Sequence, residues 1–179
     1  MFSNKYDKKN ILIIGMTGVG KTTVGRQLSK RIRSNFFDSD NQIEEFSGLK
    51  ITEFFSKYGE QEFRKLERRI IKKLIEENRE SIISTGAGFF SDNDFNYYIL
   101  SNTTTIFLDA RFETIYERLK GNIKNRPKLS GENLEKKLKF MYTSRIENYK
   151  KARITVRVDG LSIHEIVKRI VYLLEEYES

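Results

Sequence analysis

A glycine-rich run near the N-terminus is the feature that most constrains this chain. Residues 15–22 read Gly-Met-Thr-Gly-Val-Gly-Lys-Thr and fit the pattern G-x-x-x-x-G-K-[ST] at every fixed position. The apolar run 11–14 enters this loop, and a stretch with helical periodicity leaves it at Thr23. A buried strand, a glycine turn and a helix N-terminus together aim backbone N–H groups at one point, which suits the phosphates of a nucleotide.

The loop therefore predicts a site for a nucleoside triphosphate. Lys21 is expected to reach the β- and γ-phosphates, and the Thr22 hydroxyl is expected to bind Mg²⁺. A dinucleotide-binding turn is excluded, because its third glycine would fall where the chain has Thr23. A merely flexible turn would not account for the flanking strand and helix patterns. The pattern alone does not say what happens to the phosphate.

Short apolar or β-branched runs alternate with longer charged stretches of amphipathic helical spacing. This alternation predicts an α/β fold, in which helices cover both faces of a parallel sheet and ligands bind beyond the carboxyl ends of the strands. We expect a single domain over residues 1–179, because no Gly/Ser-rich linker or repeat interrupts the pattern. The expected strands are 11–14, 36–37, 81–85, 104–108 and 154–158, and the clearest helices are 23–33, 60–78, 111–120, 133–150 and 162–177.

The charge balance bears on the partners of the chain. There are 33 basic and 25 acidic residues, which give a net charge of +8, and there is no cysteine. This charge suits a solvated surface around an anionic small molecule; nucleic-acid binding is the weaker alternative, because no Arg-rich tail or zinc module favours it. The run 11–14 is too short for a signal-peptide core or a membrane span. We expect a cytoplasmic protein without disulfides, nucleic acid or membrane contact.

Two carboxylates follow the second expected strand, in the sequence Asp38-Ser39-Asp40. Residues two apart in a strand face the same side, so both side chains are expected to enter one cleft. One would help to hold Mg²⁺, and the other would accept a hydrogen bond from a substrate hydroxyl. The alternative is that Asp40 serves as the N-cap of a following helix, and the two roles are compatible.

Four further segments have both a functional and a plain structural interpretation. Arg64 and Glu67 lie three apart and are expected to pair on a helix, as many surface residues do. The sequence 86–88, Gly-Ala-Gly, offers backbone N–H groups to a ligand, or is an ordinary turn. The basic segment 120–128 would close over phosphates with Arg126, or is a solvated loop. Arg145 and Tyr149 lie four apart and share one helix face.

These segments occur in one order and spacing, and the chain resembles shikimate kinase, in the nucleoside-monophosphate-kinase group of P-loop proteins. The resemblance runs from about residue 11 to the final helix. The family's Asp-x-Asp matches residues 38–40, its Gly-Glu-x-x-Phe-Arg-x-x-Glu matches residues 59–67, and its lid Arg-Pro matches 126–127. Its arginine followed four residues later by tyrosine matches Arg145 and Tyr149. Its triple glycine is Gly-Ala-Gly at 86–88, and Lys128 stands where the family usually has leucine.

The resemblance implies a fold and a reaction. The fold would be three-layered α/β/α with a five-stranded parallel sheet in the order 2-3-1-4-5, a substrate-binding segment at about 38–68 and a lid at about 118–132. The reaction would transfer the γ-phosphate of ATP, with Mg²⁺, to the 3-hydroxyl of shikimate, on the route to chorismate and the aromatic amino acids. We expect a monomer.

The resemblance also implies a role for individual residues. Lys21, Asp40 and Arg126 would be catalytic, Thr22 and Asp38 would serve Mg²⁺, and Glu67 would orient Arg64. ATP would be bound by Gly18, Val19, Gly20, Lys21, Thr22, Thr23, Arg118, Arg126 and Arg157, of which Arg118 and Arg157 (in the turn 157–160) are placed only by rough position. Shikimate would be bound by Asp40, Phe55, Phe63, Arg64, Gly86, Ala87, Gly88 and Arg145.

Two other functions remain open at the level of sequence. A related hydroxy-acid kinase such as gluconate kinase would also use an anionic acceptor, although the arginine pattern at Arg64 and Arg145 favours shikimate. A non-catalytic P-loop regulatory protein would bind nucleotide without an acceptor, and Asp38, Asp40 and Arg126 argue against it.

Overall fold

The computed structural model describes residues 9–90, 93–120 and 134–177. The strands are β1 (Asn10–Ile14), β2 (Phe36–Asp38), β3 (Ile82–Ser84), β4 (Thr103–Asp109) and β5 (Ile154–Arg157). The helices are α1 (Lys21–Ile32), α2 (Ser39–Ser47), α3 (Ile51–Glu77), α4 (Asn93–Asn102), α5 (Phe112–Lys120), α6 (Leu134–Tyr149) and α7 (Ile163–Tyr177).

All the strands are parallel and form one sheet in the order β2-β3-β1-β4-β5, which confirms the expected topology. β1 lies at the centre, where Ile13 pairs in register with Ser84 of β3 and with Ile106 of β4. Every residue of β1 is buried, whereas β5 alternates between buried and exposed positions, as an edge strand does. The segments that follow β1, β2 and β3 therefore meet at one edge of the sheet.

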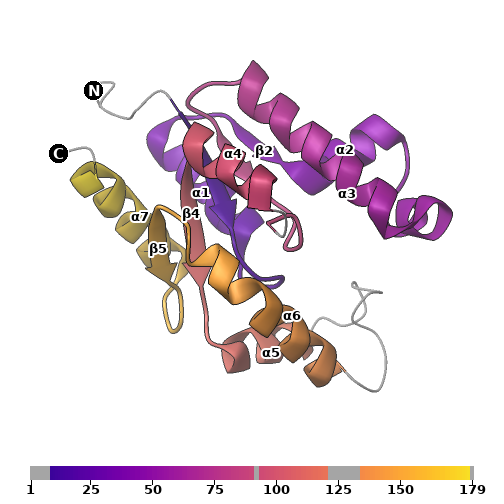
Figure 1. Ribbon diagram of the computed structural model, residues 1–179. Helices are drawn as coiled ribbons and strands as arrows, with labels where there is room; N and C mark the ends of the chain where they lie inside the picture. Colours follow the sequence, from indigo (N-terminus) through magenta and orange to yellow (C-terminus); the bar gives the residue numbers. More distant parts are fainter. Residues whose placement is uncertain (1–8, 91–92, 121–133, 178–179) are drawn as a thin grey trace.

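Helices cover both faces of the sheet (Figure 1). α1 and α7 pack against each other on one face. α3 and α4 lie together on the other face, where Tyr98 donates a hydrogen bond to Glu76 and Arg68 lies over the ring of Phe95. The core between the layers is aliphatic and aromatic, and it includes the buried residues Leu12, Ile13, Leu28, Ile71 and Phe107.

The expected helix at 60–78 is only the second part of a longer element. α3 begins at Ile51 and runs to Glu77, with a kink at Gly59, whose φ of 80° and ψ of 175° are not helical. The first part is not evident from the sequence, because a glycine inside a helical pattern resembles a helix boundary. The other expected elements are present, with ends that differ by a few residues.

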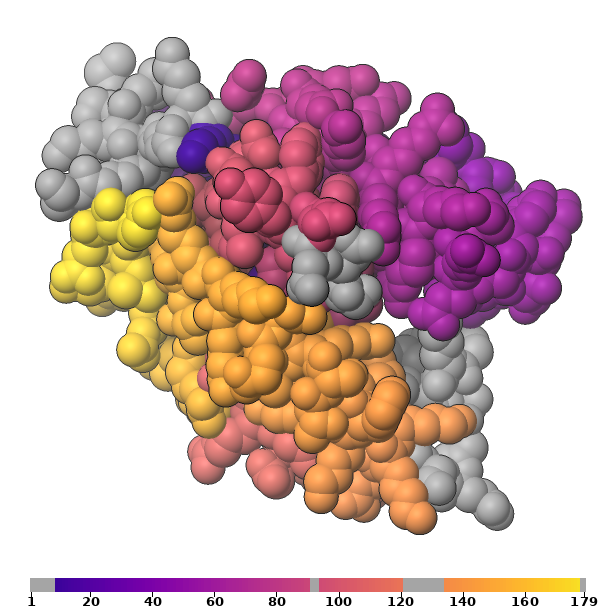
Figure 2. All heavy atoms as spheres, viewed as in Figure 1, coloured from indigo at the N-terminus to yellow at the C-terminus, as the bar shows by residue number. Residues whose placement is uncertain are grey.

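α2 and the first part of α3 form a lobe that projects beside β2, away from the rest of the sheet (Figures 1 and 2). Glu44 links α2 to the start of α3, because its carboxylate accepts hydrogen bonds from the Lys50 ammonium at 2.7 Å and from the Ile51 N–H at 3.0 Å. α6, drawn in orange, lies apart from this lobe in the lower half of the view (Figure 1). Within the three described stretches of chain, no helix is long and apolar enough to cross a membrane.

Candidate active site

The loop at residues 15–22, the P-loop, wraps around the side chain of Lys21. α1 begins at Lys21, and its N-cap, Gly20, has a φ of 104°, which favours glycine. The Lys21 ammonium donates hydrogen bonds to the carbonyl oxygens of Gly15 at 2.9 Å and Met16 at 3.0 Å. The lysine is 9% exposed, so its charge is enclosed by the loop that follows the carboxyl end of β1.

A cavity of about 240 Å³ opens beside the P-loop. Its lining comes from three segments far apart in the sequence, as the sheet topology predicted: the loop after β1, the start of α2 and the turn after β3. The lining residues are Thr17, Gly18, Gly20, Lys21, Thr22, Thr23, Asp38, Asp40, Thr85, Gly86 and Ala87. Thr17 and Thr85 were not among the expected site residues; the only signal for Thr85 was its place at the carboxyl end of the third strand.

Asp38 joins the P-loop to the lobe. The Thr22 hydroxyl donates a hydrogen bond of 2.7 Å to Asp38 Oδ2. The other carboxylate oxygen, Oδ1, accepts from the backbone N–H of Asp40 at 3.1 Å and Asn41 at 3.4 Å, and so caps α2. The expectation that Asp40 caps the helix is therefore wrong: β2 ends at Asp38 and α2 begins at the next residue, which places Asp40 in the first helical turn.

Asp40 nevertheless lines the same cavity as Asp38. Its enclosure raises the pKa of the Asp40 carboxyl above the ordinary value of 3.8, and the neighbouring Asp38 carboxylate acts in the same direction. The cations of Lys21 and Arg64 lower that pKa, but they do not offset the first two effects. A carboxyl group whose proton affinity is raised, next to a phosphate-binding loop, suits a hydrogen-bond acceptor for a reacting hydroxyl.

Arg64 and Glu67 form the predicted pair on α3. Arg64 Nη1 lies 2.6 Å from Glu67 Oε2, and Nη2 lies 3.1 Å from Glu60 Oε1. The Glu67 side chain is 1% exposed, so this is not the solvated surface pair that the spacing alone would suggest. The guanidinium also lies over the ring of Phe63, 5.4 Å from its centroid, and Phe63 packs against Phe55 with centroids 4.3 Å apart.

The turn at residues 86–88 lies against these charged groups. A side chain on Gly88 would place Cβ 2.3 Å from Arg64 Nη2, so the Arg64 guanidinium would have to shift to accommodate any other residue. Cβ on Gly86 would lie 2.7 Å from Glu67 Oε1 and 3.0 Å from Asp40 Oδ1. Among the described residues, the non-glycine residues with positive φ are Arg33 and Glu80, so Ala87 has an ordinary backbone conformation. An alanine thus fits the middle of the turn without backbone strain.

Two side chains of α6 reach the same turn from the other side. Arg145 Nη1 donates a hydrogen bond of 3.1 Å to the Ala87 carbonyl, and the Tyr149 hydroxyl donates to the same oxygen. The Gly86 N–H donates to the Ser39 hydroxyl at 3.2 Å. The structure therefore brings Asp40, Arg64 and Arg145 around one short turn.

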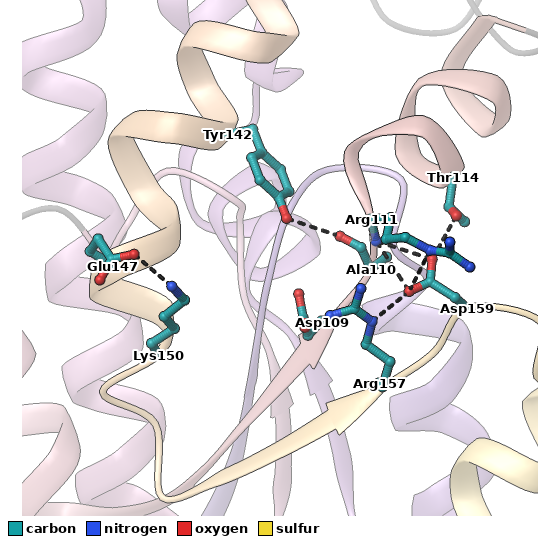
Figure 3. A network of polar contacts seen from close by, with 9 residues as sticks. All are labelled: Asp109, Ala110, Arg111, Thr114, Tyr142, Glu147, Lys150, Arg157 and Asp159. Carbon is teal, nitrogen blue, oxygen red and sulfur yellow. Dashed lines mark hydrogen bonds and ion pairs between the residues drawn. The ribbon is translucent and has the colours of Figure 1, made fainter.

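The two arginines expected near the nucleotide lie in different surroundings. Arg118, on α5, donates a hydrogen bond of 3.1 Å to the carbonyl of Val19 in the P-loop. Arg157 is 53% exposed and belongs to a separate network, in which it donates to Asp159 at 2.7 Å and to Asp109 at 2.8 Å (Figure 3). Asp159 also accepts from the Arg111 N–H and the Thr114 hydroxyl at the start of α5 (Figure 3). Arg157 is not part of the cavity lining.

Part of the expected site lies outside the described residues. Arg126 and Lys128 belong to this part, and only residues 118–120 of the expected lid are described. The roles given to these residues by the resemblance stay predictions.

Comparison with known proteins identifies the family. The shikimate kinase family model matches residues 17–175. A shikimate kinase from Thermodesulfovibrio yellowstonii is 39% identical over 171 residues, which cover 95% of each chain. The structure of shikimate kinase from Acinetobacter baumannii in complex with shikimate has a TM-score of 0.89 and 29% sequence identity, over 96% of each chain.

A gluconokinase from Sinorhizobium meliloti has a TM-score of 0.62 at 15% identity, so it shares the fold alone. The matches at higher identity distinguish between the two kinase classes that the sequence left open. The chain belongs to the shikimate kinase family, whose members are ATP-dependent kinases.

Proposed function

We propose that Asp40, Arg64 and Arg145 hold shikimate while the P-loop holds ATP, so that the γ-phosphoryl group passes directly to the 3-hydroxyl. The observation that supports this most is the shared cavity: Lys21 of the P-loop and Asp40 of α2 line one space. A nucleotide-binding protein without an acceptor would not need a half-buried carboxyl at this place. Phosphoryl transfer needs mainly positioning and charge neutralisation, which a two-sided cavity provides.

The donor side consists of the P-loop and the end of β2. Backbone N–H groups from Gly18 to Thr23 would surround the phosphates, and Lys21 would exchange its carbonyl partners for phosphate oxygens. The Thr22 hydroxyl and the Asp38 carboxylate are 2.7 Å apart and are oxygen donors of the kind that Mg²⁺ prefers. We propose that these two hold Mg²⁺, which when bound would neutralise charge on the phosphates.

The acceptor side consists of the lobe, the 86–88 turn and α6. The guanidinium groups of Arg64 and Arg145 would bind the carboxylate of shikimate through charge-assisted hydrogen bonds. Phe55 and Phe63 would form the apolar wall, and the N–H groups of the turn would add polar contacts. Asp40 would accept the hydrogen bond of the 3-hydroxyl and orient it toward the phosphate.

The lid and the nucleotide contacts complete the proposal. Arg126, in a lid at about 118–132, would contact the transferring phosphoryl group, and lid closure would exclude water as a competing acceptor. Arg118 and Arg157 would contact the nucleotide. We further propose one kinase domain over residues 1–179 that acts as a monomer in the cytoplasm, a reducing compartment that suits the cysteine-free sequence.

A coupled assay of ADP formation tests the proposal. Shikimate is expected to stimulate ADP formation strongly, and gluconate at the same concentration is not. Lys21→Met, which keeps the length of the side chain and removes its charge, should lower kcat by about 10²-fold or more. Lys30→Met is the matched control, because Lys30 is exposed in the last turn of the same helix. ADP formation that does not depend on shikimate, or a fully active Lys21→Met enzyme, would overturn the proposal.

A further inference from the structure

Tyr149 is a buried side chain with no role in the mechanism above. It is the last residue of α6 and is 1% exposed, although it carries a hydroxyl. Its ring packs against Phe107 of β4, with centroids 5.3 Å apart. The hydroxyl donates to the carbonyl of Ala87, at the middle of the 86–88 turn. A tyrosine is buried at little cost only when its hydroxyl has a partner, so the ring and the hydroxyl together determine where this carbonyl lies.

The same carbonyl determines the place of Arg145. Arg145 Nη1 donates to Ala87 O at 3.1 Å, one helical turn before Tyr149. A carbonyl oxygen has two lone pairs, and the two side chains use both. A shift of the Ala87 peptide would therefore change the direction in which the Arg145 guanidinium presents its other N–H groups.

The opposite side of the turn is in contact with the remaining acceptor residues. Gly88 approaches Arg64 so closely that a Cβ would lie 2.3 Å from Nη2. Gly86 approaches the carboxylates of Glu67 and Asp40 at 2.7 Å and 3.0 Å by the same measure. Packed groups at these distances cannot move independently, because interiors are close-packed and transmit strain. The 86–88 turn thus contacts Asp40, Arg64 and Arg145, and its position affects where all three side chains lie.

The Tyr149 phenol remains a donor under all working conditions. Burial raises the pKa of Tyr149 to about 12, and the Arg145 guanidinium, which lowers it, offsets only part of this effect. The phenol is therefore protonated throughout the neutral range, and its hydrogen bond to Ala87 does not depend on pH there.

We propose that Tyr149 is a positioning residue for the acceptor: it holds the Ala87 carbonyl in the place at which Arg145 and Arg64 converge on the shikimate carboxylate. This inference rests on the proposed acceptor site. It concerns a residue that does not itself touch the substrate, and it predicts an effect on one substrate and not on the other.

Tyr149→Phe removes the hydroxyl and keeps the ring against Phe107. We expect the KM for shikimate to rise about threefold to tenfold, the range for one lost hydrogen bond. The KM for ATP should stay within twofold, because the hydroxyl is bonded to the turn and not to the P-loop. Tyr142→Phe is the matched control: Tyr142 is also on α6, its hydroxyl donates to the carbonyl of Ala110 at 3.4 Å, and neither KM should change.

A purely structural role would give a different result. If Tyr149 only stabilised the fold, Tyr149→Phe would lower Tm and change both KM values or neither. A second measurement is the rise in Tm caused by saturating shikimate, which should be smaller in Tyr149→Phe than in the wild type and unchanged in Tyr142→Phe. This readout needs only a folded protein and no turnover.

A double-mutant cycle tests whether Tyr149 acts through Arg145. In an Arg145→Lys background, the added change Tyr149→Phe should raise the shikimate KM less than it does in the wild type. Equal effects in the two backgrounds, or equal behaviour of Tyr149→Phe and Tyr142→Phe, would overturn the inference while leaving the proposed function in place. A wild-type enzyme without shikimate-dependent ADP formation would overturn the proposed function itself.

Discussion

The Thr22 hydroxyl donates a hydrogen bond of 2.7 Å to Asp38 Oδ2, which connects the first turn of α1 to the end of β2. The other oxygen of the same carboxylate caps α2. One side chain therefore connects the phosphate-binding loop with the lobe on the acceptor side. Its two oxygens have separable tasks, and two substitutions can distinguish them.

Asp38→Asn should keep the cap and lose the metal site. An asparagine oxygen can still accept from the Asp40 and Asn41 N–H groups, since Asn and Asp are equally good N-caps. The negative charge that would attract Mg²⁺ is gone, so the Mg²⁺ concentration for half-maximal activity should rise about tenfold or more. Titration of activity with Mg²⁺ at saturating ATP measures this, and an unchanged Mg²⁺ dependence would contradict the assignment.

Asp38→Ala is the companion variant, because it removes the cap as well. Its free energy of unfolding should fall by about 0.5–2 kcal/mol relative to the wild type, the cost of a lost N-cap. Asp38→Asn should stay close to the wild type in the same urea titration. If both variants lose equal stability, the cap does not depend on the side-chain oxygen.

Arg64→Lys should weaken shikimate binding without unfolding the protein. Lysine keeps the positive charge beside the buried Glu67 carboxylate, whereas alanine would leave that charge uncompensated at a cost of about 3–5 kcal/mol. Lysine cannot bind a carboxylate with two parallel N–H groups, so the KM for shikimate should rise about tenfold or more, and the KM for ATP should not. Steady-state kinetics for both substrates, with Arg68→Lys on the same helix as the control, check this. Equal KM values for Arg64→Lys and the wild type would remove Arg64 from the acceptor site.

The local parts of this site could be predicted from the sequence, and the parts that depend on where a strand ends could not. The P-loop is one continuous run of sequence, and the Arg64–Glu67 pair follows from helical spacing alone. Both features could therefore be predicted. The Asp40 cap was wrong by two residues, because the sequence does not show that β2 stops at Asp38 with no loop before α2. That β2 and β3 lie side by side likewise depends on the sheet; the strand alternation predicted a parallel sheet, and the strand order came only from the resemblance to shikimate kinase.

The contacts between segments that are distant in the sequence could not be predicted. The burial of Glu67 comes from the approach of the 86–88 turn, about twenty residues further along the chain, and no periodicity encodes it. The carbonyl of Ala87 accepts hydrogen bonds from two side chains of α6, about sixty residues further along the chain. Thr85 was missed because a threonine after a strand pattern looks like one more strand residue.

Substitutions at Gly88 and Ala87 test whether the 86–88 turn positions Arg64. Gly88→Ala would place a methyl group 2.3 Å from Arg64 Nη2, so the guanidinium must move and the shikimate KM should rise about tenfold or more. Ala87→Gly changes no hydrogen bond, because both contacts use the carbonyl. Its KM should change less than threefold, while its stability falls by about 0.4–1 kcal/mol through the unfolded chain. If Gly88→Ala binds shikimate normally, the turn does not control Arg64.

The raised pKa of Asp40 predicts that this residue costs the folded protein stability near neutral pH. A carboxyl group that binds its proton more tightly in the folded state favours folding fully below its ordinary pKa of 3.8, and this contribution is lost as the pH rises through the folded pKa. Asp40→Asn should therefore be more stable than the wild type at pH 7, and the difference should shrink as the pH falls toward 4. Urea unfolding at pH 4–8 measures both. The same variant should lose most of its kcat, because a neutral amide is a weaker hydrogen-bond acceptor for the 3-hydroxyl than a carboxylate. A variant that is less stable at pH 7, or one that is fully active, would contradict the idea that the protein gives up stability at Asp40 for the reaction.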